Sequence, residues 1–242
     1  MYYHFILMVS DYDKGARKAY CQTFSDTKRM REFRSKIKKI KGDFKNVTFS
    51  THQLMTESKD IKSVVEYDKY FENVIFYSDE FEFEKELKDI TRITPSDILK
   101  YILTQDIEEA TKLKVMKLIY FVYEEYLKIT GKYLFEEEFE TFRLGPVERS
   151  SYNRLSKYKD EEIELEDIDI EKVKLSLKLE RLDEREEIEL AVEKAMKRYG
   201  RKKASTLVNL THQKGTPWTD IKETLGEFQI IPREIIKDYI CN

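Results

Sequence analysis

The sequence predicts an α+β protein, with a small N-terminal α+β domain followed by a mainly helical domain that carries a β-hairpin insert. Two observations predict this class. Over the first ninety residues, segments typical of strands are interrupted by helical periodicity, whereas beyond residue 92 apolar residues recur mostly every three to four positions. Gly and Pro are scarce, at 7 and 4 of 242 residues, which favours long regular elements over flexible linkers.

The first domain, residues 1–92, is expected to have the order ββαββα. Its opening stretch YYHFILMV is apolar on both alternating faces, as in a central strand. Ser25 or Asp26 can cap the start of the first helix. Residues 52–70 show no pattern that assigns an element. The expected elements are strands at 2–9, 19–24, 46–51 and 72–79 and helices at 25–42 and 82–90.

The second domain, residues 93–242, opens with a strong helix signal. Thr94 is an N-cap candidate, Pro95 takes the first helical position, and Asp97 follows three residues after the cap. The domain boundary is therefore placed just before this helix, near residue 92.

The segment 110–131 predicts the central helix of the second domain. Two apolar stripes run along it at three- and four-residue spacing, so it is expected to pack on two sides. A charged set occupies the remaining face, and its members Glu124 and Lys128 have the spacing of a favourable ion pair. This set consists of Lys114, Lys117, Glu124 and Lys128.

The middle of the second domain predicts extended structure. Phe139 and Phe142 lie in a short extended segment that Gly145 and Pro146 interrupt. Residues 160–171 then carry eight Asp or Glu, and from 172 to 179 Lys or Ser alternates with Val or Leu. A period of two predicts a strand with one solvated face, with residues 162–170 as its hairpin partner.

The C-terminal part returns to helical periodicity. Pro217 and Trp218 are predicted to form a turn between two of the helices. His212 falls on the apolar face of its helix, four residues after Val208, and is interpreted as a structural residue because no Ser, Cys or carboxylate stands near it at a catalytic spacing. The expected helices are 185–200, 204–213, 219–225 and 232–240.

Composition narrows the functional classes. The net charge is only −3, so nucleic acid is not the expected partner. Cys21 and Cys241 have no neighbouring ligand at metal spacing, so neither a metal nor another cofactor is expected. No apolar stretch reaches membrane-spanning length, and with two cysteines a reduced, cytoplasmic protein without membrane contact is expected.

An ordered set of short motifs distinguishes the second domain. A lysine- and leucine-rich helix is followed by a G-x-x-L-F turn, an F-E-x-F segment, a G-P-V break and a late L-T-H…P-W. Over roughly residues 95–240 this set resembles the Panacea antitoxin domain, the SocA-like family. Phe142 stands where tryptophan is more usual, and the acidic insert at 160–180 is longer than expected. The motif positions, taken as mainly structural, are Lys112, Leu113, Lys117, Leu118, Tyr120, Gly131, Leu134, Phe135, Phe139, Glu140, Phe142, Gly145, Pro146, Val147, Leu210, Thr211, His212, Pro217 and Trp218.

The resemblance implies a helical, non-enzymatic domain that neutralises a toxin by forming a direct complex with it. The partner would be a cognate toxin protein encoded by the adjacent gene. Phe142 and Arg143, which precede the G-P-V break, are the candidate contact residues. The alternatives are a phage or mobile-element counter-defence protein that binds and inhibits a host protein, and an enzyme with an unfamiliar site in the first ninety residues.

Overall fold

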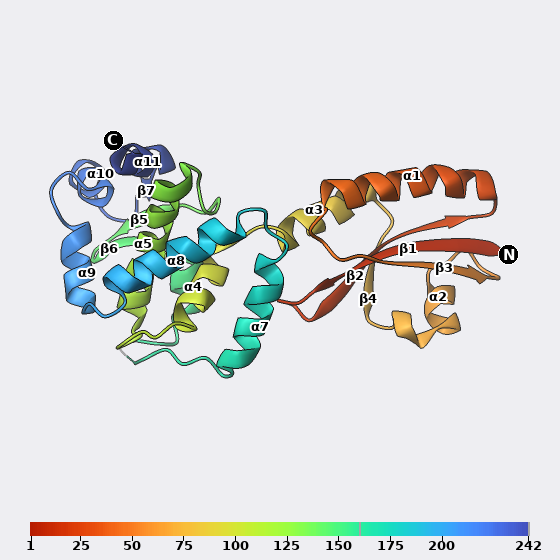
Figure 1. The fold of residues 1–242 in the computed structure, drawn as a ribbon, viewed down its shortest axis with the longest axis horizontal. Coiled ribbons are helices and arrows are strands. Elements are labelled where there is room, and N and C mark those ends of the chain that lie inside the picture. Colours follow the sequence, from red (N-terminus) through yellow and green to blue (C-terminus); the bar gives the residue numbers. More distant parts are fainter. Residues whose placement is uncertain (160, 242) are drawn as a thin grey trace. The chain divides into compact units, whose positions relative to one another are not determined.

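The structure, a computed structural model, describes residues 1–159 and 161–241 and divides into two units (Figure 1). The first unit comprises Met1–Arg92 together with Glu180–Asp183, and the second comprises Ile93–Leu179 and Glu184–Asn242. The first unit combines a four-stranded sheet with helices, and the second is mainly helical with a three-stranded sheet. The predicted α+β class is therefore confirmed.

The sheet of the first unit has the strand order β3-β1-β2-β4. Strand β1 (Tyr2–Asp11) pairs antiparallel with β2 (Ala16–Phe24) and with β3 (Ser50–Thr56). Strand β4 (Val74–Tyr77) runs parallel to β2. The predicted strand at 46–51 overlaps β3 only at Ser50 and Thr51. The rest of β3 lies within residues 52–70, for which the sequence predicts no element.

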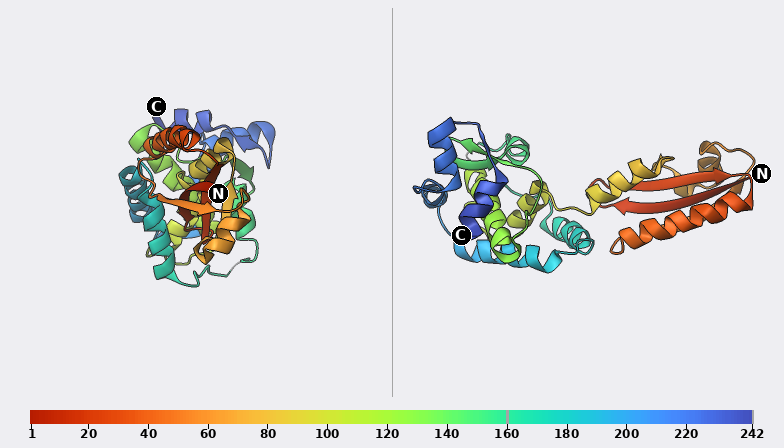
Figure 2. Two further views of the ribbon diagram at one scale, coloured as in Figure 1. Left: turned by 90° about the vertical axis from the view of Figure 1, so that its right-hand side faces the viewer. Right: turned by 90° about the horizontal axis from the view of Figure 1, so that it is seen from above.

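Helices cover both faces of this sheet, which explains why β1 is apolar on both sides (Figure 2). Phe5 and Leu7 pack with one pair of helices, and Ile6 and Met8 pack against the opposite helical segment. The first pair is α1 (Thr27–Asp43) and α3 (Glu80–Ile90), and the opposite segment is α2 (Lys62–Tyr67) with the 3-10 helix η1 (Lys69–Phe71).

The second unit is built around α5 (Lys112–Thr130), in which every residue from Lys114 to Leu127 is buried. The prediction of a central helix is confirmed, but the charged face predicted for it is not solvated. Lys114, Lys117 and Glu124 are buried because further elements pack on that side too. The elements in contact with α5 include α4 (Pro95–Leu103), α8 (Arg185–Tyr199), α9 (Ala204–Thr211), α11 (Arg233–Cys241) and strand β6 (Gly145–Glu148).

The predicted start of α4 is confirmed as a capping box. The Thr94 hydroxyl accepts a hydrogen bond from the Asp97 amide at 3.3 Å, and the Asp97 carboxylate accepts one from the Thr94 amide at 2.8 Å. Lys178 Nζ lies 2.8 Å from the same carboxylate, so this cap also anchors a distant helix.

The second sheet has the order β6-β5-β7, with all pairs antiparallel. Its other strands are β5 (Phe139–Phe142) and β7 (Ile230–Ile231), and β6 leads directly into α6 (Arg149–Arg154). Phe139 and Phe142 are thus extended, as predicted, and the Gly145–Pro146 break forms the start of a returning strand.

The β-hairpin insert predicted for residues 162–180 is wrong. Residues Ile168–Leu179 form helix α7, which buries Leu175, Lys178 and Leu179. Lys100 Nζ of α4 lies 2.9 Å from the Glu171 carboxylate, which together with the Lys178 ion pair fixes one face of α7 against α4. The buried face therefore includes charged residues, which the alternation of apolar side chains alone did not reveal.

The turn predicted at Pro217 and Trp218 is also wrong. These residues begin helix α10 (Pro217–Leu225), with Pro217 in the first turn and the Thr216 side chain as N-cap. Proline fits this position because the first helical amide has no partner within the helix.

Candidate functional site

The hairpin formed by β5 and β6 positions the predicted contact residues. Phe142 pairs with Gly145, so Arg143 and Leu144 alone form the turn. Along β5 the side chains alternate: Phe139 and Thr141 are buried, whereas Phe142 is only partly covered. Leu144 is 41% exposed, and Arg143 is exposed beside it. The turn therefore presents one apolar and one cationic side chain to solvent.

Gly145 allows this turn to lie against the centre of the second unit. Its φ of +109° is strained for any residue with a side chain. A Cβ atom at this position would lie 2.6 Å from Lys117 Nζ and 2.6 Å from Thr211 Oγ1. Glycine is required here both by conformation and by space.

Lys117 is fully buried beneath the hairpin. Its Nζ donates a hydrogen bond of 2.6 Å to the Pro146 carbonyl. Burial lowers the pKa of the Lys117 ammonium well below its usual value. An amine held in this way joins α5 to β6 and has no access to solvent, so its position indicates a structural role.

His212 and Trp218 stack in parallel, with ring centroids 3.8 Å apart and planes 1° from each other. The Trp218 indole Nε1 donates a hydrogen bond of 3.0 Å to the Phe142 carbonyl. Burial, with the nearby Lys117 and Lys222 charges, lowers the pKa of His212. The stack joins the end of α9 to the start of α10 and holds both against β5.

The remaining motif residues mostly fill the core around α5. Tyr120 meets Phe139 edge-on at 5.0 Å, and Gly131, with φ of +67°, ends the helix. The motif residues that are only partly buried include Lys112, whose ammonium lies 3.4 Å from the centre of the Tyr152 ring, and Glu140, which pairs with Arg149. Leu113 and Leu210 are also partly buried. The buried members of this set are Leu118, Tyr120, Leu134, Phe135, Phe139, Pro146, Val147, Thr211 and Pro217.

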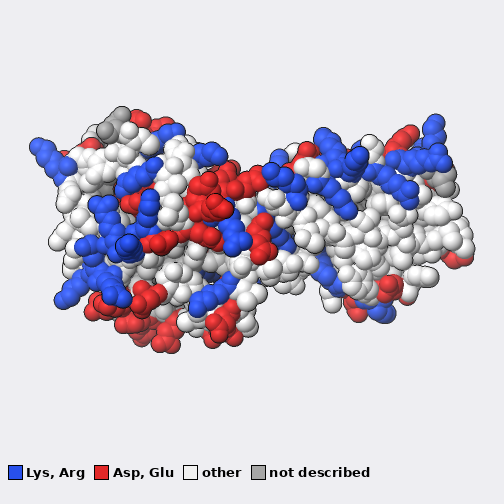
Figure 3. Space-filling view, in the orientation of Figure 1, with Lys and Arg blue, Asp and Glu red and all other residues white. Residues whose placement is uncertain are grey.

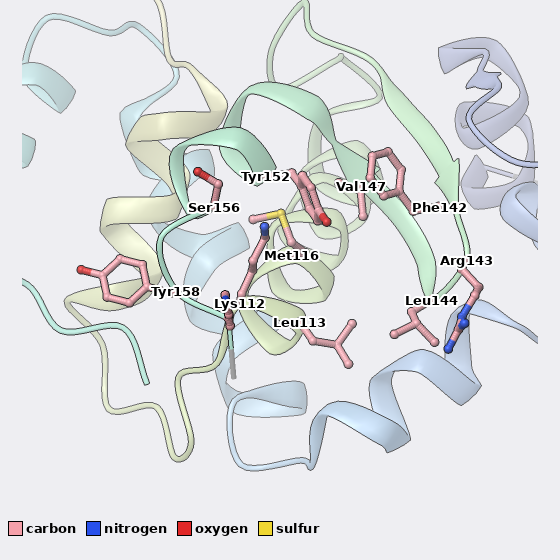
Figure 4. Close-up of a pocket in the computed structure, with 11 residues that line it drawn as sticks. Lys112, Leu113, Met116, Phe142, Arg143, Leu144, Val147, Tyr152, Ser156 and Tyr158 are labelled. Carbon is pink, nitrogen blue, oxygen red and sulfur yellow. The ribbon is translucent and has the colours of Figure 1, made fainter. Parts of the chain in front are cut away.

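A cavity of about 430 Å³, here called the turn cavity, opens beside the β5–β6 turn (Figure 4). Its walls are largely apolar, and among the described residues that line it the charged side chains are three cations, on Lys112, Arg143 and Lys159. Figure 4 shows Phe142, Val147 and Tyr152 close together, with Arg143 and Leu144 standing on the turn. The remaining lining residues are Leu113, Met116, Ser156 and Tyr158.

An aromatic cluster adjoins the turn cavity. Phe142 contacts Tyr152 at 4.9 Å and Phe228 at 5.0 Å between ring centroids. The Arg149 guanidinium lies 5.0 Å from the Phe142 ring and donates from Nε to Glu140 at 2.9 Å. Phe228 is 56% exposed. Phe142 is one of the predicted contact residues, whereas its neighbours Tyr152, Arg149 and Phe228 were not predicted, because they come from other segments that meet Phe142 only in the folded chain.

A second cavity, of about 280 Å³, lies on another side of α5 and is more polar. It is lined in part by Glu124, Tyr120 and Tyr239. Burial raises the pKa of the Glu124 carboxyl to about 7. The carboxyl is therefore largely protonated under mildly acidic conditions.

The described part of the chain shows neither a metal site nor a membrane-spanning helix. Within residues 1–159 and 161–241, no group of three or more His, Cys, Asp or Glu side chains is placed to hold a metal ion. None of the helices in this part of the chain has the length and apolar character needed to cross a membrane. Cys21 is buried and Cys241 is exposed, and both are free thiols.

Comparison with known proteins identifies part of the second unit. Residues 115–219 match the family model described as antitoxin SocA-like, Panacea domain, whereas the N-terminal region matches no family. No curated protein and no solved structure matches the chain. The matched span is shorter than the 95–240 expected from the motifs, but it contains the buried Lys117, the β5–β6 hairpin and the His212–Trp218 stack. Over residues 115–219, the second unit is therefore similar to the antitoxin SocA-like Panacea domain.

Proposed function

We propose that this protein is an antitoxin that neutralises a toxin protein by binding it directly. The observation that carries the proposal is an exposed turn, with one apolar and one cationic side chain, beside a largely apolar cavity whose lining lies mostly in the span that matches an antitoxin family. We assign the binding surface to the turn cavity, the turn residues Arg143 and Leu144, and the aromatic cluster of Phe142, Tyr152 and Phe228.

The chemistry of this surface fits a protein partner. Aromatic side chains and arginine dominate the energetics of protein interfaces, and an anchor that fills a pocket contributes most of the affinity. The turn cavity offers such a pocket, with cations at Lys112, Arg143 and Lys159. The partner is therefore expected to insert an apolar or aromatic side chain that is flanked by acidic residues.

The scaffold holds this surface in place before binding. The Phe142 carbonyl is fixed by the Trp218 indole, and Gly145 is confined between Lys117 and Thr211. A rigid turn loses little conformational entropy when it binds, which favours affinity.

Binding rather than catalysis is proposed for this site because of its lining. Among the eleven described residues that line the turn cavity, Ser156 carries the only aliphatic hydroxyl, and none is a His, Cys, Asp or Glu that would activate it. The lining side chains can exclude water and pair with acidic groups.

The test is to express the product of the adjacent reading frame alone and together with this protein, and to measure growth and co-purification. Relief of toxicity with a stable complex is the expected result. The variants Arg143→Glu and Leu144→Asp should bind the toxin at least about tenfold more weakly than the wild type does, and should keep the wild-type melting curve. Leu190→Asp is the matched control, because Leu190 is 39% exposed on α8, outside the lining of the turn cavity.

Two outcomes would count against the proposal. Variants of the turn that still rescue growth would show that the toxin binds elsewhere on the protein. If the product of the adjacent reading frame is harmless and forms no complex with this protein, a counter-defence protein that inhibits a host protein would be favoured instead.

A further inference from the structure

Strand β3 forms an edge of the first sheet that is open to pairing. It pairs with β1 on one side, and no other strand in the described part of the chain pairs with its outer side. Thr51, Gln53 and Met55 are exposed on the face that carries α1. An unpaired edge presents a row of backbone donors and acceptors that can take up another strand.

A row of cations lies along α1 beside this edge. Arg31, Arg34, Lys38 and Lys41 follow each other at spacings of three and four residues, so they share one flank of the helix. Arg34 Nη2 donates to the Gln53 side chain at 3.1 Å, and Lys41 Nζ donates to the Thr51 hydroxyl at 2.9 Å. These two bonds show that the flank faces β3.

The cation row has no acidic residue of its own helix beside it. Glu32 and Asp43 lie on the other flank of α1, as their positions on the helical period require. The exposed residues of β3 on this face are uncharged. In Figure 3 the blue side chains gather along α1, next to a largely uncharged surface.

The dimensions of the row match an extended peptide. Lys41 lies ten positions after Arg31, which is about 15 Å along a helix. Three alternate residues of a strand span about 14 Å. Because Arg34 meets Gln53 and Lys41 meets Thr51, the helix and the strand run side by side in opposite directions. A strand added to β3 would thus run along the cations.

We propose that the first unit binds an acidic extended peptide segment, which adds to the outer edge of β3 and points alternate carboxylates at the cation row. Backbone hydrogen bonds would supply the register, and the four cations would select Asp or Glu at every second position. A peptide fits better than nucleic acid, because residues 1–92 carry eighteen Lys and Arg against sixteen Asp and Glu and so produce no broad basic field. The proposal goes beyond the antitoxin role, since this unit lies outside residues 115–219.

The test uses the full chain and a fluorescein-labelled nine-residue peptide in which Thr and Glu alternate, with binding followed by fluorescence anisotropy. The control peptide has the same composition with its glutamates in one block, and it should bind more weakly. Arg31→Glu with Lys38→Glu should weaken binding of the alternating peptide by roughly tenfold or more. Lys28→Glu with Lys39→Glu is the matched control, because both residues are exposed on α1 but lie away from β3.

Two further peptides test strand addition. One carries N-methyl groups on the backbone nitrogens of its odd-numbered residues, and the other carries them on those of its even-numbered residues. Only every second amide of an added strand points at β3, so one methylated peptide should bind like the parent and the other should fail to bind. Equal binding of both would overturn the proposal, because the contact would then be ionic without strand pairing. Tighter binding of a twelve-nucleotide oligothymidine, lost in the Arg31→Glu and Lys38→Glu variant, would also overturn it and assign the surface to nucleic acid.

Discussion

The contacts of Trp218 connect two helices and a strand through one side chain. Its ring stacks on His212, its Nε1 bonds the Phe142 carbonyl, and it is only 6% exposed. Trp218→Ala should lower the free energy of unfolding by about 3 kcal/mol, because it removes a large buried ring and leaves a cavity. Urea unfolding followed by circular dichroism measures this. Trp218→Phe keeps a ring on His212 and should cost less; an unchanged stability of the alanine variant would show that the stack is not structural.

The buried carboxyl of Glu124 predicts a pH dependence. Burial raises its pKa to about 7, while Lys128, Tyr120 and Arg198 act in the opposite direction. The folded protein therefore holds this proton more tightly than the unfolded chain does. The resulting stabilisation is complete below about pH 4.5, amounts to about 3 kcal/mol, and is lost as the pH rises through 7.

Glu124→Gln tests this dependence, because it keeps the shape of the side chain and removes its titration. Urea unfolding between pH 4.5 and 8 should show a smaller loss of stability with rising pH for the variant than for the wild type. Parallel curves for the two proteins would contradict the raised pKa.

The sequence predicted which residues belong to the site better than it predicted how deeply they are buried. Lys117, Gly145 and Trp218 were selected from the sequence through motifs that lie far apart along the chain, and the structure places them around one hairpin. The burial of Lys117 and Glu124 was not predictable, because periodicity shows which side of a helix is polar but not that β6, α9 and α11 cover it. The ion pair predicted between Glu124 and Lys128 is also wrong, since Lys128 Nζ lies 3.0 Å from the Glu125 carboxylate instead.

At the scale of the element, α7 shows where apolar alternation misleads. Val173, Leu175, Leu177 and Leu179 alternate with Lys or Ser as a strand would. The residues that meet α4 are instead spaced as on a helix, and they include the charged side chains of Glu171 and Lys178. Glu171 pairs with Lys100 of α4 as well as with Lys174 of α7 itself, and Lys178 pairs with Asp97 of α4. The partners on α4 belong to a separate helix, and this information is absent from the local pattern.

The exposed Val173 gives a direct test of the helical state. It is 59% exposed, so packing contributes little at this position. Val173→Ala should raise the free energy of unfolding by about 0.5 kcal/mol, because alanine is the better helix former. In a strand the same change would destabilise the protein, since β-branched residues are preferred there. Chemical denaturation of both proteins distinguishes the two outcomes, and Val173→Gly, expected to destabilise, serves as the control.

At the scale of the whole molecule, the two units have separate cores. The core of the first unit is formed by its sheet with α1, α3 and α2, whereas that of the second surrounds α5. Trp218→Ala should therefore increase amide hydrogen exchange in peptides from residues 93–179 and 184–241 and leave those from residues 1–92 unchanged. Mass spectrometry of exchange in the full chain measures this. A matching increase in the first ninety-two residues would show that the units unfold together.

Gly145 has a practical consequence for changing what this protein recognises. The residue is confined by its backbone angle and by Lys117 and Thr211, whereas the two preceding residues, Arg143 and Leu144, are exposed and bear none of these constraints. A display library that randomises positions 143 and 144 and keeps 145 as glycine should retain a folded scaffold in most of its members. Selection from such a library would retarget the protein to new ligands at little cost in stability.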